Sequence, residues 1–282
     1  MEPTQLKSRP VVVLYGSTGL IGSELSRQLD FAGAVVIRPT RQNPLEGAPL
    51  QGPVTFIFAN GITDPRVPEH ALREANIEFP RRIIEWTAGN RQARYVTLGS
   101  IMENFEDLCA TNPYLRSKRD LGRMMQELAD PRALHVRLHT VYGGTPKAHM
   151  FLGQIFEAIR QNREFRMSHG RQLREFHHVE DVAHSLITIL NHEPGSEALA
   201  SSVITLSSGE PVRLADLAQS VFKALDREHL LQVGAIQAPS AENTEQVFPR
   251  TGTALLPRVR GAVHGVTHWI KDLLDKSAST VT

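Results

Sequence analysis

The chain has 282 residues, of which 41% are hydrophobic and 22% are charged, as in an ordinary soluble globular protein. Its 31 Lys and Arg nearly balance its 30 Asp and Glu, so the composition gives no sign of a nucleic-acid surface or an acidic tail. The lone cysteine, Cys109, cannot form an internal disulfide, and the first ten residues lack the apolar core of a signal peptide. No stretch approaches the ~18 continuous apolar residues of a membrane span. We therefore expect a cytoplasmic protein that acts on a small molecule, with no nucleic-acid partner and no membrane partner.

The first predicted element is a strand at Val11–Tyr15, which leads through three glycines into a predicted helix at Leu20–Phe31. The first glycine allows a sharp turn, the second lets backbone N–H groups approach a pyrophosphate, and the third lets the helix pack closely on the strand. The phosphates would then lie at the helix N-terminus, where unpaired N–H groups and the helix dipole favour negative charge. Glycines also occur in ordinary loops, but the strand before and the helix after favour a dinucleotide site. The residues predicted to bind the cofactor here are Gly16, Ser17, Thr18, Gly19, Leu20, Ile21 and Gly22.

The second predicted strand, Ala34–Ile37, ends where such a site distinguishes NAD from NADP. An acidic residue at this point would bind the ribose hydroxyls of NAD, whereas an arginine would accept the 2′-phosphate of NADP. Arg38 and Arg41 follow the strand, and no Asp or Glu occurs before Glu46. The pattern predicts NADP as the cofactor, in its reduced form NADPH, with NAD less favoured. The structural alternative is a pair of solvated surface arginines.

Apolar runs of strand length recur along the first half of the chain, and longer segments with helical spacing separate most of them. This alternation predicts right-handed crossovers and a doubly wound parallel α/β sheet of the Rossmann type, covered on both faces. The further strands are expected at Val54–Ala59, Tyr95–Leu98 and Leu134–Leu138, and the further helices at His70–Thr87 and Tyr114–Leu128.

Three side chains form a candidate catalytic group. Tyr114 and Lys118 are four residues apart, which puts the phenol and the ammonium on one face of their helix. A phenol has an ordinary pKa of about 10, and positive charge from Lys118 and from an oxidised nicotinamide would favour the phenolate. Ser100 follows the strand at 94–98, at the carboxyl edge of the sheet, where its hydroxyl could share a substrate oxygen with the phenol. The alternative for Tyr114 and Lys118 is that their spacing on a helix surface arises by chance. The alternative for Ser100 is that it caps a helix or a turn.

From about Gly144 the alternation loosens, which indicates a smaller C-terminal lobe. We expect a nucleotide-binding Rossmann domain at residues 1–143 and a substrate-binding lobe at residues 144–282, with some segments returning to the Rossmann core. The elements expected in the lobe are a helix at Phe151–Gln161, a polar patch at Ser168–Arg174, a helix at Val179–Leu190, a strand at Ser202–Leu206, a polar surface connection at Gln237–Thr253 and a closing helix at Val263–Leu274.

The segment Arg174–Asp181 combines a phosphate-binding side chain with a helix start. Arg174 can contact two phosphate oxygens at once. Acidic residues suit a helix N-terminus, so Asp181 is as consistent with a structural role as with a functional one. His177 and His178 resemble metal ligands, but neighbours in an extended segment point to opposite faces, and no Cys or carboxylate spacing completes a site. No metal is expected.

These motifs together resemble the extended short-chain dehydrogenase/reductase family, in its branch of nucleotide-sugar epimerases, dehydratases and reductases. The resemblance extends over nearly the whole chain and implies a homodimer and a nucleotide-sugar substrate. It also implies that Ser100, Tyr114 and Lys118 carry the proton chemistry and that Arg174 holds the nucleotide diphosphate. The matching segments are the glycines at 16–22, FANG at 58–61, RLHTVYG at 137–143 and REFHHVED at 174–181; by the same resemblance Ala59, Asn60, Gly61, Tyr114 and Lys118 contact the cofactor.

Departures from the family pattern reduce the number of reactions that this chain is expected to catalyse. Ile101 and Met102 follow Ser100 where the family's 4,6-dehydratases have an Asp-Glu pair, which argues against dehydration. The family's GDP-fucose synthases use NADPH with a similar pair of arginines, and they have a Cys where this chain has Met102. A thioether carries no proton, which argues against epimerisation by that route even though His149 fits the position of their His. Ketone reduction needs only the serine, the tyrosine, the lysine and the cofactor.

Three more departures concern the surroundings of the site. The segment between Arg41 and Val54 is short and lacks the Asp-Leu that usually contacts adenine, so a strand is expected to be missing there. Thr140 replaces the Asn that is common before Val-Tyr-Gly, and Gly122 replaces the Glu that often follows the lysine by four residues.

The sequence therefore predicts NADPH-dependent reduction of a nucleotide-linked 4-keto-6-deoxy sugar. An NAD(P)-dependent nucleotide-sugar 4-epimerase is the alternative. A non-catalytic dinucleotide-sensing regulator is disfavoured by the tyrosine and lysine, and a non-sugar ketone or aldehyde substrate stays open. The residues predicted to bind the substrate are Ser100, Met102, Thr140, His149 and Arg174.

Overall fold

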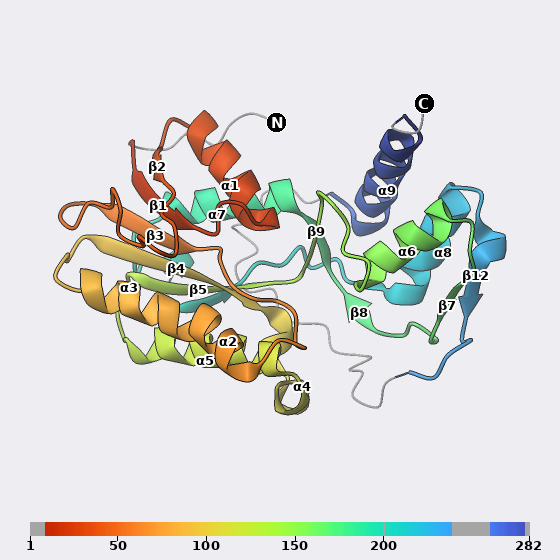
Figure 1. Cartoon of the computed structure of the whole chain (residues 1–282), viewed down its shortest axis with the longest axis horizontal. Helices are drawn as coiled ribbons and strands as arrows, with labels where there is room; N and C mark the ends of the chain where they lie inside the picture. Colours follow the sequence, from red (N-terminus) through yellow and green to blue (C-terminus); the bar gives the residue numbers. More distant parts are fainter. Residues whose placement is uncertain (1–8, 200, 239–259, 280–282) are drawn as a thin grey trace. The chain divides into compact units, whose positions relative to one another are not determined.

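The computed structural model describes residues 9–199, 201–238 and 260–279, which divide into two compact units (Figure 1). Within the described part of the chain, the first unit contains residues 9–138 and 182–206 without residue 200, and the second contains residues 139–181, 207–238 and 260–279. The predictions for the start of the chain and for most of the 237–253 connection lie outside the described residues. Substrate binding by the second unit stays a prediction.

The first unit is built on a six-stranded parallel sheet with the strand order β10-β5-β4-β3-β1-β2. The order turns back at β1, which lies between β2 and β3, so the two crossover directions diverge there. Ligands bind at such a point, at the carboxyl ends of the strands. The doubly wound Rossmann-type sheet predicted from the sequence is confirmed. The strands are β1 Val11–Tyr15, β2 Val35–Ile37, β3 Val54–Phe58, β4 Ala93–Ser100, β5 Ala133–Leu138 and β10 Val203–Thr205.

Helices cover both faces of this sheet (Figure 1). On one face lie α1, Leu20–Phe31, and α7, Val179–Leu190; on the other lie α2, Glu69–Arg73, α3, Phe79–Thr87, and α5, Pro113–Glu127. The helix predicted at 70–87 is therefore present, but it contains a π-helical turn, η1, at Glu74–Glu78. Pro80 has no N–H to complete an α-helical bond to the residue four before it, which accounts for the wider turn. Two short elements that were not predicted, a 3₁₀ turn η2 at Ile101–Asn104 and α4 at Glu106–Thr111, precede α5.

One hydrophobic core of the first unit lies between the sheet and α3 and α5, and buried residues of α1 and α7 cover the other face. Strands buried on both faces need continuous apolar sequence, and VVVLY in β1 and VTFIF in β3 provide it. Aromatic rings hold neighbouring strands together, since Tyr15 stacks on Phe58 with centroids 5.1 Å apart and Phe56 stacks on Tyr95 at 5.7 Å. The segment after β2 forms no strand up to Val54, as expected, so β2 lies at the edge of the sheet.

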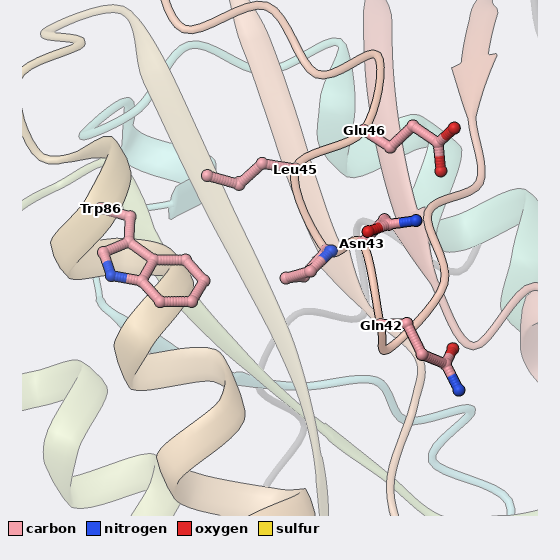
Figure 2. A pocket seen from close by; sticks show the side chains of 6 residues that line it. Gln42, Asn43, Leu45, Glu46 and Trp86 are labelled. Atoms are coloured by element: carbon pink, nitrogen blue, oxygen red, sulfur yellow. The ribbon is translucent and has the colours of Figure 1, made fainter.

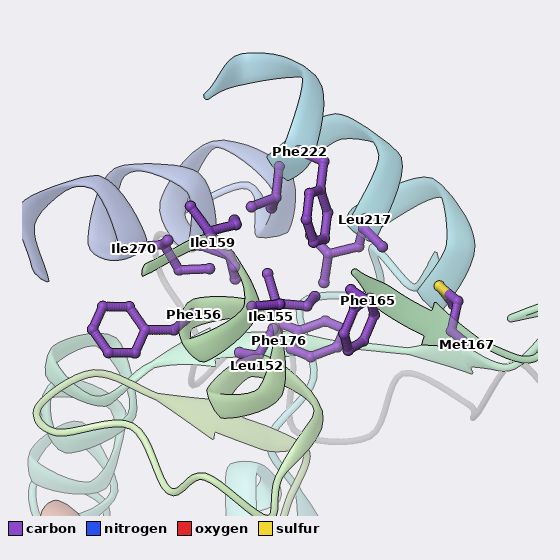
Figure 3. Close-up of a cluster of buried hydrophobic side chains, with 14 of the residues drawn as sticks. Leu152, Ile155, Phe156, Ile159, Phe165, Met167, Phe176, Leu217, Phe222 and Ile270 are labelled. Atoms are coloured by element: carbon purple, nitrogen blue, oxygen red, sulfur yellow. The ribbon is translucent and has the colours of Figure 1, made fainter. Parts of the chain in front are cut away.

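Among its described residues, the second unit contains three α-helices and three two-stranded sheets. Side chains from α6, α8 and α9 meet in its core together with Phe165, Met167 and Phe176 from short strands (Figure 3). The closing helix was predicted, whereas α8 and the short strands were not. None of the described helices is both long and apolar enough to cross a membrane. The elements are α6 Phe151–Arg160, α8 Leu214–Ala224 and α9 Ala262–Ser279, with β6 Thr140–Tyr142 beside β9 Phe176–His178, β8 Leu173–Arg174 beside β11 Val212–Arg213, and β7 Phe165–Met167 beside β12 Leu231–Val233.

Candidate functional site

The glycine-rich turn connects β1 to α1 at the carboxyl edge of the sheet, and neighbouring backbone atoms leave no room for a Cβ at Gly16 or Gly22. Gly16 has a φ of +77°, and a Cβ added to it would lie 2.5 Å from the backbone nitrogen of Asn60. A Cβ on Gly22 would lie 2.0 Å from the carbonyl oxygen of Gly16. Gly19 is the N-cap of α1 and supplies no side-chain hydrogen bond, so the first N–H groups of the helix are left for a ligand. This cradle fits the pyrophosphate of a dinucleotide.

The turn after β3 lies directly beside the glycine cradle. The Ala59 N–H donates to the carbonyl of Tyr15 at 3.1 Å, and Gly61 has a φ of +143°, which a non-glycine residue rarely adopts. The Oδ1 atom of Asn60 is buried and has no hydrogen-bond partner in the described structure. Buried acceptors normally have a donor, so this oxygen fits a hydrogen bond from a bound cofactor.

Asn76, a buried residue of the π-helical turn, fixes this loop and was missed in the sequence analysis. Its side chain accepts the N–H of Ile62 at 2.9 Å and donates to the carbonyl of Ile62 at 3.0 Å and to Ser117 Oγ at 2.8 Å. One amide thus connects the strand-end loop to α5. No local pattern marks it, because its partners are 14 and 41 residues away.

α5 carries Lys118 to the carboxyl end of β4. Asn112 caps the helix by accepting the Leu115 N–H at 3.2 Å, and Pro113 occupies its first position, so the helix begins just before Tyr114. The buried ammonium of Lys118 donates to the carbonyl of Leu98 at 2.9 Å. A Cβ on Gly61 would lie 3.6 Å from this Nζ, so the lysine also borders the turn after β3. Burial lowers the pKa of Lys118 to about 8.

Tyr114 lies in the first turn of α5, one turn before Lys118. Its side chain is half-buried, and burial together with the negative charge of Glu103 raises the pKa of the phenol to about 12. The phenol is therefore protonated near neutral pH. Positive charge near the phenol was expected to favour the phenolate, whereas burial and Glu103 favour the proton-carrying form in the structure.

Ser100 is the last residue of β4, and its Oγ accepts the N–H of Met102 at 3.3 Å. The cap role considered as the structural alternative is thus present. An oxygen that accepts one bond can still donate its proton to a substrate, so the two roles are compatible. Met102 itself is half-buried in the 3₁₀ turn that Ser100 caps.

Glu103 completes that cap and was also missed. Its Oε2 accepts the backbone N–H of Ser100 at 2.9 Å, and its Oε1 lies 3.0 Å from His135 Nε2 and 2.7 Å from Arg137 Nε. The spacing of a serine and a glutamate three residues later is the capping-box pattern, which could have identified it from the sequence.

The two arginines after β2 differ in their surroundings. Arg38 forms an ion pair with Asp30 at the end of α1, and its Nε donates to Ser26 Oγ at 2.7 Å. No acidic residue follows β2 before Glu46, but Asp30 of the preceding helix reaches Arg38 in the folded structure. Arg41 is exposed, and its positive charge helps to lower the pKa of Glu74.

The remaining predicted substrate residues lie in the second unit. The Thr140 N–H on β6 donates to the carbonyl of Glu175 at 3.1 Å, which places Thr140 beside the strand that follows Arg174. The Arg174 guanidinium, half-buried, donates to the Leu173 carbonyl at 2.8 Å and to Gln172 Oε1 at 3.2 Å. His149 is exposed before α6.

The adjacent histidines and Asp181 have structural partners within the second unit. His177 is buried, with Nε2 3.0 Å from Glu175 Oε2, whereas the ring of His178 contacts that of Tyr142. Asp181 accepts the Arg260 N–H at 3.3 Å. In the part of the chain that the structure describes, no cluster of three or more His, Cys, Asp or Glu side chains could hold a metal ion.

A separate pocket lies on the first unit, between the loop after β2 and α3 (Figure 2). It contains none of the predicted site residues. Trp86, whose side chain is 54% exposed, borders it, and the loop is held by Tyr15 Oη, which donates to the Pro44 carbonyl at 2.7 Å. The residues lining this pocket are Gln42, Asn43, Pro44, Leu45, Glu46 and Trp86.

Comparison with known proteins decides the family. Residues 59–200, half of the chain, match the model of the NAD dependent epimerase/dehydratase family. The chain belongs to this family. The resemblance to extended short-chain dehydrogenases/reductases stated from the motifs is therefore confirmed, and with it the assignment to a family of NAD(P)-dependent enzymes.

Individual relatives are distant. CDP-abequose synthase of Salmonella muenchen is 22% identical over 199 residues, which cover 69% of this chain and 66% of that protein. MoeE5 in complex with UDP-glucose and NAD superposes with a TM-score of 0.70 at 19% identity, over 95% of this chain and 99% of that one. GDP-L-fucose synthetase from Naegleria fowleri bound to NADP gives 0.70 at 14% identity, over 98% and 96%. These structural likenesses establish the shared fold, and the solved neighbours bind NAD in one case and NADP in the other.

Proposed function

We propose that this protein is an NADPH-dependent reductase of a nucleotide-linked 4-keto-6-deoxy sugar. The observation that carries the proposal is the geometry of α5, which presents the Tyr114 phenol one turn before the buried Lys118 ammonium at the carboxyl end of β4. A reductase must deliver a proton to the oxygen that was the ketone. A phenol that holds its proton is ready for this step, whereas an enzyme that first oxidises an alcohol needs the phenolate.

The dinucleotide would occupy the cradle of Gly16, Gly19 and Gly22 and the turn at residues 59–61. The first N–H groups of α1, which no side chain caps, and the buried Asn60 Oδ1 support this fit. When bound, the reduced cofactor would supply the hydride, while burial and Glu103 keep the Tyr114 phenol protonated.

The chain's own residues then perform the proton chemistry. Ser100 donates a hydrogen bond to the ketone oxygen and polarises it. As negative charge develops on this oxygen, Tyr114 transfers its proton to it and becomes a phenolate, so the carbonyl is converted to a secondary alcohol. The Lys118 ammonium, fixed by the Leu98 carbonyl, stabilises the phenolate until solvent returns the proton.

Arg38 and Arg41 are proposed to select NADPH. The Asp30–Arg38 pair is an obstacle, but the Arg38 side chain is 35% exposed and that of Asp30 54%. Exposed ion pairs contribute only about 0–1 kcal/mol, so a 2′-phosphate that binds the guanidinium through two hydrogen bonds can displace the carboxylate.

An NAD(P)-dependent nucleotide-sugar 4-epimerase is the second candidate, and the same Asp30 favours it. If Arg38 stays paired with Asp30, it cannot bind a 2′-phosphate, and the site would favour NAD over NADPH. This preference suits an enzyme that retains its cofactor and uses the same hydride to oxidise and then to reduce the substrate.

Arg174 is proposed to hold the substrate diphosphate, with Met102, Thr140 and His149 near the sugar. We expect Arg174→Ala to raise KM with a smaller effect on kcat, because a diphosphate contact is equal in the ground and transition states. An unaltered KM would place the diphosphate elsewhere. The homodimer and the cytoplasmic location that the sequence implies stay predictions.

The decisive experiment mixes the protein and NADPH with a panel of nucleotide-linked 4-keto sugars and follows the absorbance of the reduced nicotinamide. A reductase consumes one NADPH per alcohol formed, and in deuterated water it adds no label beside the ketone above the uncatalysed background. Conversion to an epimer without net NADPH loss would contradict the reductase and support the second candidate. Enzyme-dependent label beside the ketone would show that His149 or another residue exchanges a proton there.

A further inference from the structure

Glu103 lies three residues after Ser100, and its carboxylate is completely buried, which is unusual for a charged group. The described partners of its two oxygens are the Ser100 N–H on one side and His135 and Arg137 of β5 on the other. His135 is fixed in turn by Thr97, whose Oγ1 lies 2.8 Å from Nδ1. Burying a charge costs several kcal/mol unless it is well paired, so this arrangement is specifically held rather than incidental.

The same carboxylate lies against the catalytic face of α5. Tyr114, Lys118 and Gly122 are spaced four residues apart and therefore share one face of the helix. A Cβ on Gly122 would lie 3.1 Å from Glu103 Oε1 and 3.1 Å from His135 Nε2. The absence of a side chain at Gly122 thus lets the Glu103–His135 pair approach the helix, one turn beyond Lys118.

We propose that Glu103 is a positioning residue of the site, which fixes the Ser100 backbone at the sheet edge and supplies a negative charge to the Tyr114–Lys118 face of α5. The proposal rests on the roles proposed above for these three residues. It assigns to Glu103 two effects on the same step: the serine hydroxyl is held in place, and the tyrosine and lysine are kept in their proton-carrying forms.

Electrostatics agrees with this geometry. Burial raises the pKa of Glu103, but hydrogen bonds from His135, Arg137 and the Ser100 N–H lower it below its usual value, so the residue is an anion at neutral pH. Burial and this anion both raise the pKa of Tyr114, and the anion opposes the lowering of the Lys118 pKa by burial. The titratable and charged groups that the structure places around Glu103 are His135 and Arg137 on β5, Tyr114 and Lys118 on α5, and Cys109 on α4.

The test measures the pKa of Lys118 without requiring any substrate. The chain has only six lysines, so in protein labelled with ¹³C-lysine the Lys118 signal can be assigned by its loss in Lys118→Arg. The substitution Glu103→Gln keeps an acceptor for the Ser100 N–H and removes the charge, while its NH2 group replaces the oxygen that accepts from Arg137. We expect it to lower the pKa of Lys118 from about 8 by about half to one pH unit.

Glu106→Gln is the matched control, because this glutamate is three residues away, is 83% exposed and pairs with Arg119. It should leave the Lys118 titration unchanged. A folded Glu103→Gln protein in which Lys118 titrates as in the wild type, or at higher pH, would overturn the proposal. If Glu103→Gln does not fold, Arg137→Met is the second test, because it removes the cation that pairs with Glu103 and leaves the negative charge of Glu103 less compensated. The pKa of Lys118 should then rise. A lowered or unchanged pKa would contradict the proposal.

Activity gives a second readout that separates this inference from the proposed function. If the wild type reduces a 4-keto sugar, the alkaline limb of kcat/KM should move to lower pH in Glu103→Gln, whereas a merely structural role would lower activity or thermal stability without moving this limb. If the wild type reduces no such sugar, the proposed function fails while the lysine titration still decides the role of Glu103.

Discussion

The pKa of Tyr114 governs which way a proton moves at this site. Because burial and Glu103 keep the phenol protonated, we expect Tyr114→Phe to remove the proton donor while the ring still fills its place. General acid catalysis contributes roughly 10²–10⁴-fold, so kcat for reduction should fall by that factor while NADPH binding stays nearly unchanged. Steady-state kinetics and a fluorescence titration with NADPH measure the two effects.

Tyr95→Phe is a suitable control, since Tyr95 is a buried tyrosine of the same unit whose hydroxyl contacts Thr87 Oγ1 at 2.9 Å. It should lose some stability and keep its kcat. If Tyr114→Phe retains more than about a tenth of the wild-type kcat, well above the range for a lost acid catalyst, another group donates the proton.

Cofactor selection also depends on single residues, and Asp30 makes it testable in both directions. Replacing Arg38 and Arg41 together by Ala should weaken NADPH binding by roughly 10- to 100-fold and leave NADH binding nearly unchanged, because only NADPH carries the 2′-phosphate.

Asp30→Asn should instead tighten NADPH binding by about severalfold, since it frees Arg38 from an exposed ion pair. Calorimetry with both nucleotides measures these constants, and an equal loss for both in the double variant would show that the arginines are structural.

At the scale of elements, the contact between α1 and the preceding turn depends on Gly22. A Cβ at this position would meet the Gly16 carbonyl oxygen at 2.0 Å, so Gly22→Ala must push the helix away from the turn. We expect a loss of about 1–3 kcal/mol in the free energy of unfolding and a severe loss of dinucleotide binding. Gly89→Ala is the control, because a Cβ there meets nothing within 4 Å. Equal effects of the two substitutions on NADPH affinity would contradict a cradle built on Gly22.

The elements also show what the sequence could and could not reveal. The helices α1 and α7 and the strand β1 have the predicted bounds because their apolar spacing is regular over whole elements. Strands of two or three residues, such as β8 and β11, carry no such period, and their pairing connects distant segments. Local motifs likewise revealed the glycine turn and the Tyr114–Lys118 spacing. Pairs such as Glu103–His135, 32 residues apart, arise only when the fold brings separate segments together.

The described residues form two compact units, each with a cluster of buried hydrophobic residues, and each unit contains one tryptophan that can report on it. The chain has two tryptophans: Trp86 lies on α3 in the first unit, and Trp269 lies on α9 in the second, where its indole N–H donates to the Gly144 carbonyl at 3.1 Å. Trp86→Phe therefore leaves fluorescence that reports on the second unit alone. This allows the stability of that unit to be followed without assuming that the whole chain unfolds in one step.

The buried Glu175 and His139 predict that the stability of the second unit falls at low pH. Glu175 is buried, which by itself would raise its pKa, but hydrogen bonds from His177, Ser207 and Ser208 lower it to about 2. The stabilisation is therefore complete above the ordinary pKa of 4.5 and is lost as the pH falls toward 2. Burial lowers the pKa of His139 from 6.5 to about 4, so the unfolded chain takes up this proton first and stability already falls below pH 6.5.

Replacing Glu175 by Gln should remove the contribution that the charge of this carboxylate makes to the stability of the second unit. The shift of its pKa corresponds to at most about 3 kcal/mol, so in the Trp86→Phe background Glu175→Gln should lower the unfolding free energy of the second unit at pH 7 by up to this amount. The difference from the parent should shrink between pH 4.5 and 2, where the parent carboxylate itself becomes protonated. Urea unfolding followed by Trp269 fluorescence at several pH values measures this, with the exposed Glu210→Gln as the control. A difference that stays constant down to pH 2 would mean that the Glu175→Gln substitution costs stability through packing, and that the charge of Glu175 does not hold the segment 173–178 to Ser207 and Ser208.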